Sequence, residues 1–219
     1  YHLASRFSKF HNVPELTNIL SSVADFYQVE KAMGLPDFDG YTDSVVVGDD
    51  DFKDFLKDIS TRADDVRKKR VDKKVDNLLK ITTDGRKAAL DIRLTVPKAK
   101  FTYQSKVARC AENVFEIYAK TEKEKLTQLV FCDTSTPKKE FNLYDEMTRL
   151  LCLMGMPEDK IAYVHDATTE KKRTELFEAV QKGEIRVLMG STFKLGLGVN
   201  VQDKLIALHH IDVPWRPAD

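Results

Sequence analysis

Residues 190–202, GSTFKLGLGVNVQ, hold the residue types best suited to chemistry in this chain. The glycines allow close backbone approach, and N–H groups together with the hydroxyls of Ser191 and Thr192 can bind phosphate oxygens. Lys194 adds a positive charge. The segment therefore predicts contact with a phosphate-bearing partner, although glycines at this spacing also occur in ordinary tight turns.

The same segment is not a complete nucleotide site. No Gly-x-x-x-x-Gly-Lys-Ser/Thr sequence occurs in the chain, and Val201 stands where a Gly-x-Gly-x-x-Gly pattern needs its third glycine. The adjacent acids Asp145 and Glu146 lie in a stretch with helical apolar spacing that does not follow a buried strand. We interpret this pair as a helix surface and not as a metal-binding acid pair.

Two other polar loops follow apolar runs that have the length of strands. Asp133-Thr134-Ser135 follow one run, and His165-Asp166 follow another. Ligands of parallel α/β sheets bind at the carboxyl ends of the strands, so these loops are predicted to lie beside the glycine-rich segment. Asp166 has an alternative interpretation as the cap of the next helix.

Other candidates for catalysis or metal binding are weaker. His209 and His210 are neighbours on a predicted strand and must point to opposite faces, which argues against one shared metal ion even with Asp212 nearby. Cys132, at a strand end, is interpreted as an inert thiol. We therefore predict no metal site and no catalytic residue in this chain.

The elements that must position these loops lie in residues 105–219, where helical and strand patterns alternate. Such alternation predicts an α/β fold, a parallel sheet with helices on both faces. The short strands are mostly apolar, as expected when both faces are buried. The expected helices are 107–120, 143–154 and 169–181, and the expected strands are 128–132, 161–164, 186–189 and 205–211.

The pattern changes near Pro97, so we divide the chain into residues 1–100 and 101–219. The first part is predicted to be a mostly helical appendage. We expect a helix from Pro14 to about Gly34, a strand or extended linker at 44–47, a helix after Asp49, and a helix or pair of helices interrupted at 82–85.

Composition narrows the class of protein. The 219 residues include 35 basic and 35 acidic side chains, and no apolar run approaches the ~20 residues that span a bilayer. The three cysteines are widely spaced and contain no Cys-x-x-Cys pair, so reduced thiols and a cytoplasmic location are expected. Residues 67–74 contain six bases and one acid, which suits either phosphate contact or a solvated helix face.

Several segments resemble, in order, the motifs of the second RecA-like lobe of superfamily-two helicases. Residues 127–132, TQLVFC, resemble motif IV. Residues 187–200 resemble motif V, and this match is the most specific, because a strand, a Ser-Thr pair, two spaced glycines and an asparagine follow in order. Residues 165–177 resemble the family's intervening loop and helix, and residues 210–218 resemble the Trp-Arg-Pro turn that leads to motif VI. The chain thus resembles the Swi/Snf-like branch of DNA translocases.

Residues 7–16 and 79–91 resemble the inter-lobe linker of large bacterial proteins of mobile elements, in which such a motor is joined to a DNA methylase. The resemblance implies DNA and a first RecA-like lobe of the same polypeptide as partners, with a fused methylase domain as a further candidate. It implies that the first lobe precedes Tyr1 and that motif VI follows Asp219. ATP and Mg²⁺ are expected in the intact two-lobe protein, with neither bound to this fragment, which alone is predicted to be inactive.

Site residues are carried over by motif. For nucleotide contact the resemblance implies Gly196, Gly198 and Asn200. For DNA contact the candidates are Asp133, Thr134, Ser135, Ser191, Thr192, Lys194, Arg86 and Lys87. A rival interpretation is a non-catalytic α/β module that docks another protein, whereas a complete small nucleotide-dependent enzyme is disfavoured by the missing phosphate loop.

Overall fold

A computed structural model describes residues 12–24, 39–196 and 199–213 of the chain. It divides into two compact units, residues 1–40 and 41–219. The first contains α1 (Val13–Ser21), which has Pro14 in its first turn, as predicted. The helix ends at Ser21, earlier than predicted, and the expected end near Gly34 lies outside the described residues. Residues 25–38 lie outside the described part.

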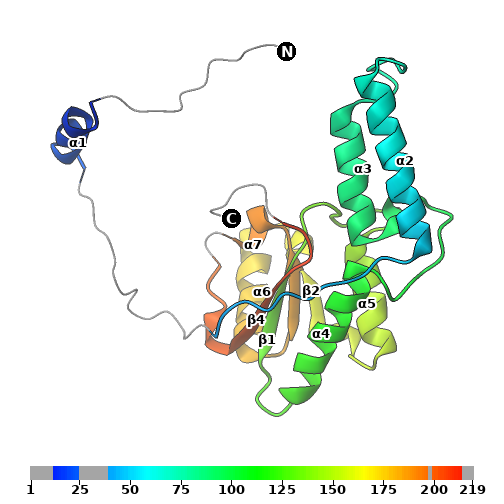
Figure 1. The fold of residues 1–219 in the computed structure, drawn as a ribbon. Helices are drawn as coiled ribbons and strands as arrows, with labels where there is room; N and C mark the ends of the chain where they lie inside the picture. The colour runs from blue at the N-terminus through cyan, green and yellow to red at the C-terminus, as the bar shows by residue number, and fades with distance from the viewer. Residues whose placement is uncertain (1–11, 25–38, 197–198, 214–219) are drawn as a thin grey trace. The chain divides into compact units, whose positions relative to one another are not determined.

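The second unit is built on a four-stranded sheet in which every strand pair is parallel (Figure 1). Its strands are β1 (Thr127–Phe131), β2 (Ile161–Tyr163), β3 (Val187–Gly190) and β4 (Leu205–His210), in the order β2-β3-β1-β4. Each strand is preceded by a helical connection, so the carboxyl ends of all four meet at one edge. The predicted α/β fold is confirmed.

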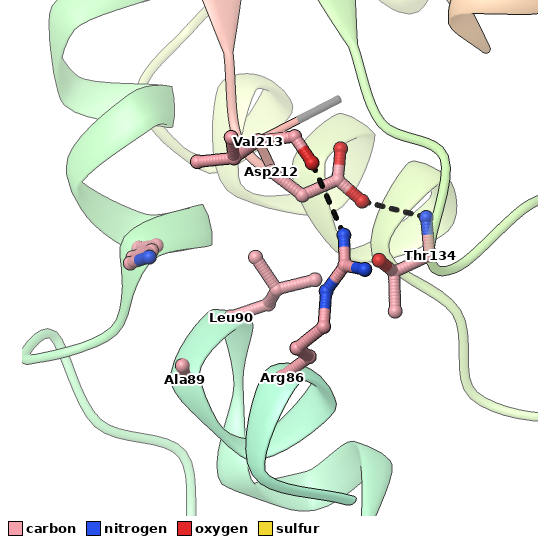
Figure 2. Close-up of a pocket in the computed structure, with 7 residues that line it drawn as sticks. Arg86, Ala89, Leu90, Thr134, Asp212 and Val213 are labelled. Atoms are coloured by element: carbon pink, nitrogen blue, oxygen red, sulfur yellow. Dashed lines mark hydrogen bonds between the residues drawn. The ribbon is translucent and has the colours of Figure 1, made fainter. Parts of the chain in front are cut away.

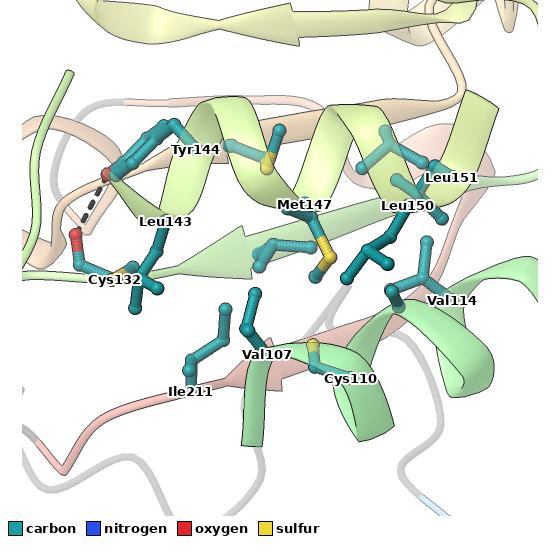
Figure 3. Close-up of a cluster of buried hydrophobic side chains, with 14 of the residues drawn as sticks. Val107, Cys110, Val114, Cys132, Leu143, Tyr144, Met147, Leu150, Leu151 and Ile211 are labelled. Atoms are coloured by element: carbon teal, nitrogen blue, oxygen red, sulfur yellow. Dashed lines mark hydrogen bonds between the residues drawn. The ribbon is translucent and has the colours of Figure 1, made fainter. Parts of the chain in front are cut away.

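Helices cover both faces of this sheet. On one face lie α4 (Lys106–Lys120) and α5 (Leu143–Leu153), and on the other lie α6 (Glu170–Lys182) and the short α7 (Thr192–Leu195). In Figure 3 the apolar side chains of α5, among them Met147 and Leu151, point toward Val107 and Val114 of α4. On the opposite face, Leu129 and Leu188 pack in a second cluster with Val180 of α6.

The edge strand β4 departs from the expectation that both strand faces are buried. Its burial alternates along the strand, and Ile206 and Leu208 remain 50% and 54% exposed. Among the described residues β4 has a neighbouring strand, β1, on one side only, so its exposed apolar residues have fewer groups to pack against. In contrast, every residue of β1 and of β3 is buried.

Two long helices, α2 (Asp50–Arg67) and α3 (Leu78–Leu90), form a hairpin in the same unit. Asp49 caps α2 by accepting from the Phe52 N–H, as the acidic start of this helix suggests. The expected interruption at 82–85 is wrong, because α3 runs through it without a break. Burial of Ile81, Ala88 and Leu90 outweighs the ~1 kcal/mol that Gly85 costs a helix.

Before this hairpin the chain is extended. Residues 44–47 form no strand, and Ser44 accepts a hydrogen bond from the Asn113 amide of α4. The alternative of an extended linker is therefore confirmed. Short 3-10 turns complete the described elements: η1 (Ile92–Leu94), η2 (Glu158–Lys160), η3 (Val164–Asp166) and η4 (Gln202–Lys204).

The base of the hairpin is fixed to the sheet layers. Leu90 belongs to the apolar cluster of α4 and α5. Just after it, Arg93 bonds Asp91 at 2.7 Å and Glu146 of α5 at 2.8 Å, and its guanidinium lies over the ring of Phe141. Helices assigned to residues 1–100 therefore pack directly on elements assigned to residues 101–219.

Candidate functional site

The predicted polar loops meet at the carboxyl edge of the sheet. β1 and β3 are hydrogen-bonded neighbours with Phe131 opposite Gly190, so the segments that follow them leave the sheet side by side. A Cβ on Gly190 would lie 2.5 Å from Leu195 and 2.6 Å from Val164, so only glycine permits the close approach of these elements. The α/β topology thus brings the loop after β1 and the loop after β3 together.

Asp133 joins these two loops directly. Its carboxylate accepts one hydrogen bond from the Thr192 N–H and one from the Thr192 hydroxyl, both 2.7 Å long. Both carboxylate oxygens are therefore engaged, and their charge opposes a direct approach of phosphate. The geometry makes Asp133 a link that orients the start of α7.

Asp212, at the end of β4, fixes the other side of the β1 loop. Its side chain is 7% exposed and accepts from the Asp133 N–H at 3.0 and 3.1 Å and from the Thr134 N–H at 2.6 Å. The sequence interpretation weighed Asp212 only as a neighbour of the two histidines. The signal that points to this role is an acid placed directly after the apolar β4 strand, at the carboxyl edge.

Ser135 has a structural contact. It is 4% exposed, and its hydroxyl accepts from the Leu143 N–H at the start of α5. Close by, the Tyr144 hydroxyl donates to the Cys132 carbonyl, the bond drawn in Figure 3. Burial raises the pKa of the Cys132 thiol to about 12, so the thiol is protonated at neutral pH. The hydrogen bonds of Ser135 and Tyr144 therefore fix the β1 loop to the start of α5.

The candidate residues of the glycine-rich segment 190–202 occupy and surround α7. Ser191 is buried, Lys194 is half-buried, and the Lys194 carbonyl accepts from Arg173 of α6. Gly196 and Asn200 are exposed, and the Asn200 carbonyl accepts from Gln181 at 2.7 Å. Gly198 lies outside the described residues. The side chains of Lys194 and Asn200 form no hydrogen bond or ion pair within the described ranges, which leaves them available to a ligand.

His165 lies at the end of β2, beside the same loops. Its Nδ1 is buried and has no hydrogen-bond partner among the described residues, and its ring meets the Tyr144 ring edge-on at 5.3 Å. Burial and then the charge of Lys194 lower the pKa of His165, so the ring is neutral at pH 7. The alternative that Asp166 caps the next helix is wrong: the turn of η3 leaves it short of α6, and Thr169 caps instead by accepting from the Lys172 N–H.

The two C-terminal histidines face opposite sides of the sheet, as predicted. His209 pairs with the Gln128 side chain at 2.9 Å, and burial lowers its pKa to about 4. His210 stacks on the Phe131 ring at 4.8 Å. Across the described residues, no three His, Cys, Asp or Glu side chains converge in the way a metal ion needs.

Only one residue of the acid pair on α5 lies on the helix surface, as was expected of both. Asp145 is exposed, whereas Glu146 is only 6% exposed and ion-paired to Arg93 and Arg149. The interpretation of the pair as a helix surface is therefore wrong for Glu146. Arg93 approaches from the segment after α3 and buries this carboxylate, a tertiary contact that helical spacing does not reveal.

Of the two basic candidates on α3, Arg86 reaches the carboxyl edge. Its guanidinium donates to the Val213 carbonyl at 3.1 Å, beside Asp212 and Thr134 (Figure 2). Lys87 is half-buried and does not line this cavity. The structure therefore gathers Arg86, the β1 loop and the end of β4 around one cavity and leaves Lys87 outside it.

Comparisons with protein-family models, with curated proteins and with solved structures give no match for this chain. In the described ranges, none of the helices combines the length and the apolar character that crossing a bilayer requires.

Proposed function

We propose that this chain is the second motor lobe of a cytoplasmic ATP-dependent DNA translocase or helicase, with a helical linker before it. The observation that best supports this proposal is the double hydrogen bond from Thr192 to Asp133. It links the loops of motifs IV and V into one polar edge at the carboxyl ends of a parallel sheet, where ligands of such folds bind.

In this proposal, DNA phosphates contact the outer side of that edge. Lys194 supplies charge, and the hydroxyl of Thr134 and the amide of Asn200 supply hydrogen bonds, whereas Ser191 is buried and supports the loop from below. Asp133 and Asp212 do not touch DNA but hold the backbone on which these donors stand. Contacts of this kind go to phosphates and carry little sequence information, so binding is expected to be insensitive to DNA sequence.

ATP binds between the two lobes in this scheme. When bound with Mg²⁺, it supplies the free energy of phosphoryl transfer that drives opening and closing of the lobes. The residues of this chain that would face the nucleotide are Gly196, Gly198 and Asn200. Because Asp133 joins the two loops, any displacement of α7 on lobe closure is transmitted to the β1 loop that lies against DNA.

The tip of the α2–α3 hairpin supplies a second basic surface. Arg67 and Arg70 pair with nearby aspartates on α2 at 3.5 and 3.3 Å. Lys68 and Lys69 are exposed and form no ion pair with described residues. Their charge suits contact with duplex DNA beyond the sheet edge.

Titration of the chain with a fluorescent duplex over a range of salt concentrations tests the proposal. We expect the logarithm of the affinity to fall linearly with the logarithm of the salt concentration. Lys194→Gln should reduce the slope by about 0.9, because one phosphate contact is lost, while the matched Lys182→Gln on the opposite edge should leave it unchanged. Absence of binding at the lowest salt would contradict the proposal.

A protein-docking module is the second candidate, favoured by the half-exposed Ile206 and Leu208 on β4 and by Val213, which is 76% exposed. This candidate expects no affinity for DNA at any salt. It expects instead that Leu208→Lys abolishes capture of a protein partner without changing the thermal midpoint of unfolding. The DNA titration and this substitution therefore separate the two functions.

A further inference from the structure

His165 lies at the junction between the end of β2 and α7. It belongs to η3, which packs against both β3 and α7. Because Gly190 has no side chain, Val164 of η3 and Leu195 of α7 come together at this position. His165 directly follows Val164 in the sequence, and Lys194 directly precedes Leu195. The side chains of His165 and Lys194 therefore start from the same junction.

The two ring nitrogens of His165 have different surroundings. Nδ1 is buried without a hydrogen-bond partner among the described residues, and the ring meets the Tyr144 ring edge-on at 5.3 Å. Nε2 also makes no hydrogen bond to a described residue but, unlike Nδ1, it is not buried. A neutral imidazole carries one proton, and burying an N–H group that has no acceptor is costly. The proton of the neutral ring therefore belongs on Nε2, which makes this nitrogen a hydrogen-bond donor at the carboxyl edge.

The surroundings of the ring keep it neutral. Burial has the largest effect on the pKa of His165 and lowers it, the charge of Lys194 lowers it further, and Asp166 raises it by less. Tyr144 of α5 is uncharged, because burial raises the pKa of its hydroxyl, and β3 carries no ionisable side chain. A second proton would also have to enter on Nδ1, where no acceptor lies within the described ranges. The ring is thus a donor that carries no charge.

The junction offers mainly donors to a ligand. The ammonium group of Lys194 forms no hydrogen bond or ion pair within the described part of the chain, and neither does Nε2 of His165. Arg173 of α6 donates to the Lys194 carbonyl at 3.3 Å and adds positive charge near α7. A ligand with a negative charge and several acceptor oxygens matches this arrangement.

We propose that His165 contacts the same phosphate group as Lys194, donating from Nε2–H to a phosphate oxygen while Lys194 supplies the charge. The source of the phosphate rests on the proposed function, and it is then the DNA backbone. A free phosphate has the same chemistry, and the experiments separate the two sources. Loss of the His165 donor should weaken binding without changing its dependence on salt, whereas loss of Lys194 should change both.

The first experiment measures duplex DNA binding by the full 219-residue chain over a range of salt concentrations. His165→Phe keeps a ring against Tyr144 but removes the donor, and it should weaken binding about fivefold with an unchanged salt slope. Lys194→Gln should instead lower the slope by about 0.9. His165→Gln is the matched control, because its amide N–H can take the place of Nε2–H, and it should restore most of the affinity.

Thermal unfolding followed by circular dichroism shows whether His165→Phe and His165→Gln keep the fold. Equal losses of affinity in these two variants would assign a purely structural role to His165 and overturn the inference. Unchanged affinity in His165→Phe would exclude DNA as the source of the phosphate, and the proposed function would then stand on its own titration with Lys194→Gln.

The second experiment follows the histidine ring nitrogens of the unsubstituted chain by ¹⁵N NMR, so it does not depend on how a variant folds. At pH 7 the proton of His165 should be found on Nε2. Inorganic phosphate, added at constant ionic strength with chloride as the reference, should shift the Nε2 signal, and duplex DNA should do the same. The His209 ring, which pairs with the Gln128 side chain, is the internal control and should not shift.

The two ligands have separate outcomes in this experiment. A shift of Nε2 with inorganic phosphate alone assigns the site to a free phosphate, whether or not the chain binds DNA. A proton on Nδ1, or no shift of Nε2 with either ligand, overturns the inference even where salt-dependent DNA binding supports the proposed function.

Discussion

One arginine that bonds two carboxylates joins the base of the α2–α3 hairpin to the sheet domain (β1–β4 and the helices α4–α7), and another lies along the hairpin itself, but the two clusters differ in burial. Arg93 is 14% exposed and bonds Asp91 and Glu146, which are 1% and 6% exposed. Arg62 of α2 is 24% exposed and bonds Asp76 and Asp84, which are 14% and 25% exposed. The same chemistry therefore involves buried carboxylates at the base of the hairpin and partly exposed carboxylates along its length.

This difference in burial indicates that charged residues of the hairpin have little effect on the packing of the carboxyl edge. The base of the hairpin shares the core through Leu90 and the Arg93 cluster, while α2 has no buried residue at all. Changes near the tip should remain local, whereas changes at the base should reach the carboxyl edge. This contrast leads to four expected effects, from the largest to the smallest.

The largest loss of stability is expected for Arg93→Ala. It leaves Asp91 buried without its cation and Glu146 with Arg149 alone, and breaking a buried ion pair typically costs about 3–5 kcal/mol. Urea denaturation followed by circular dichroism measures this change in the free energy of unfolding. A loss below about 1 kcal/mol would show that the cluster does not hold the base of the hairpin.

Asp212→Asn should cost about 2 kcal/mol, because an amide cannot accept from the N–H groups of Asp133 and Thr134 with both of its polar atoms. Asp203→Asn, an exposed acid in η4, is the matched control and should cost almost nothing. Equal midpoints of urea unfolding for the two variants would contradict the role given to Asp212.

Because of His209, we expect the stability of the sheet domain to depend on pH. Burial lowers its pKa to about 4, below the ~6.5 of an unfolded chain, so the unfolded state takes up the proton first as pH falls. The contribution of His209 to stability is complete above pH ~6.5 and is lost between pH ~6.5 and about 4. At pH 5 the loss should be roughly 2 kcal/mol.

The measurement compares the free energy of unfolding at pH 7 and at pH 5 in the unsubstituted chain and in His209→Gln. The glutamine variant should lose less stability across this range, since other titrating groups are common to both chains. The same pH dependence in both would rule out His209 as its source.

The smallest loss of stability is expected for Arg62→Ala. It should lower the free energy of unfolding by roughly 1 kcal/mol, because water and salt screen a partly exposed cluster. The deficit should shrink further in 1 M salt, where the Debye length is about 3 Å. Hydrogen exchange should accelerate in α2 and the outer part of α3 and stay unchanged in β1. A deficit as large as that of Arg93→Ala would remove the contrast between the two regions.

Periodicity in the sequence predicts the elements of the sheet domain well. The apolar runs that become β1 and β3 are fully buried, and α4, α5 and α6 lie within two residues of the expected bounds, whereas the short α7 was not expected. Prediction fails where tertiary contacts compete with local signals. Gly85 does not interrupt α3, because Ala88 and Leu90 beyond it are buried against the rest of the unit.

The site is predicted in location and less well in detail. The loops after β1 and β3 do lie together, since the α/β pattern predicts parallel strands, whose carboxyl ends share one edge of the sheet. The hydrogen bonds that fix these loops cannot be read from spacing, because those from Thr192 to Asp133 and from the Asp133 and Thr134 N–H groups to Asp212 join residues far apart in the sequence. Motif resemblance identifies polar residues without separating Asp133, which holds a neighbour in place, from Lys194, which is open to a ligand.

DNA-stimulated ATP hydrolysis by the longer, two-lobe polypeptide that the proposed function requires is the most direct measurement of the central claim. We predict that Lys194→Ala combined with Asn200→Ala lowers the DNA-stimulated rate at least tenfold and leaves the fold of the sheet domain intact. Unchanged DNA-stimulated hydrolysis in that double variant would contradict the claim that these loops belong to a motor.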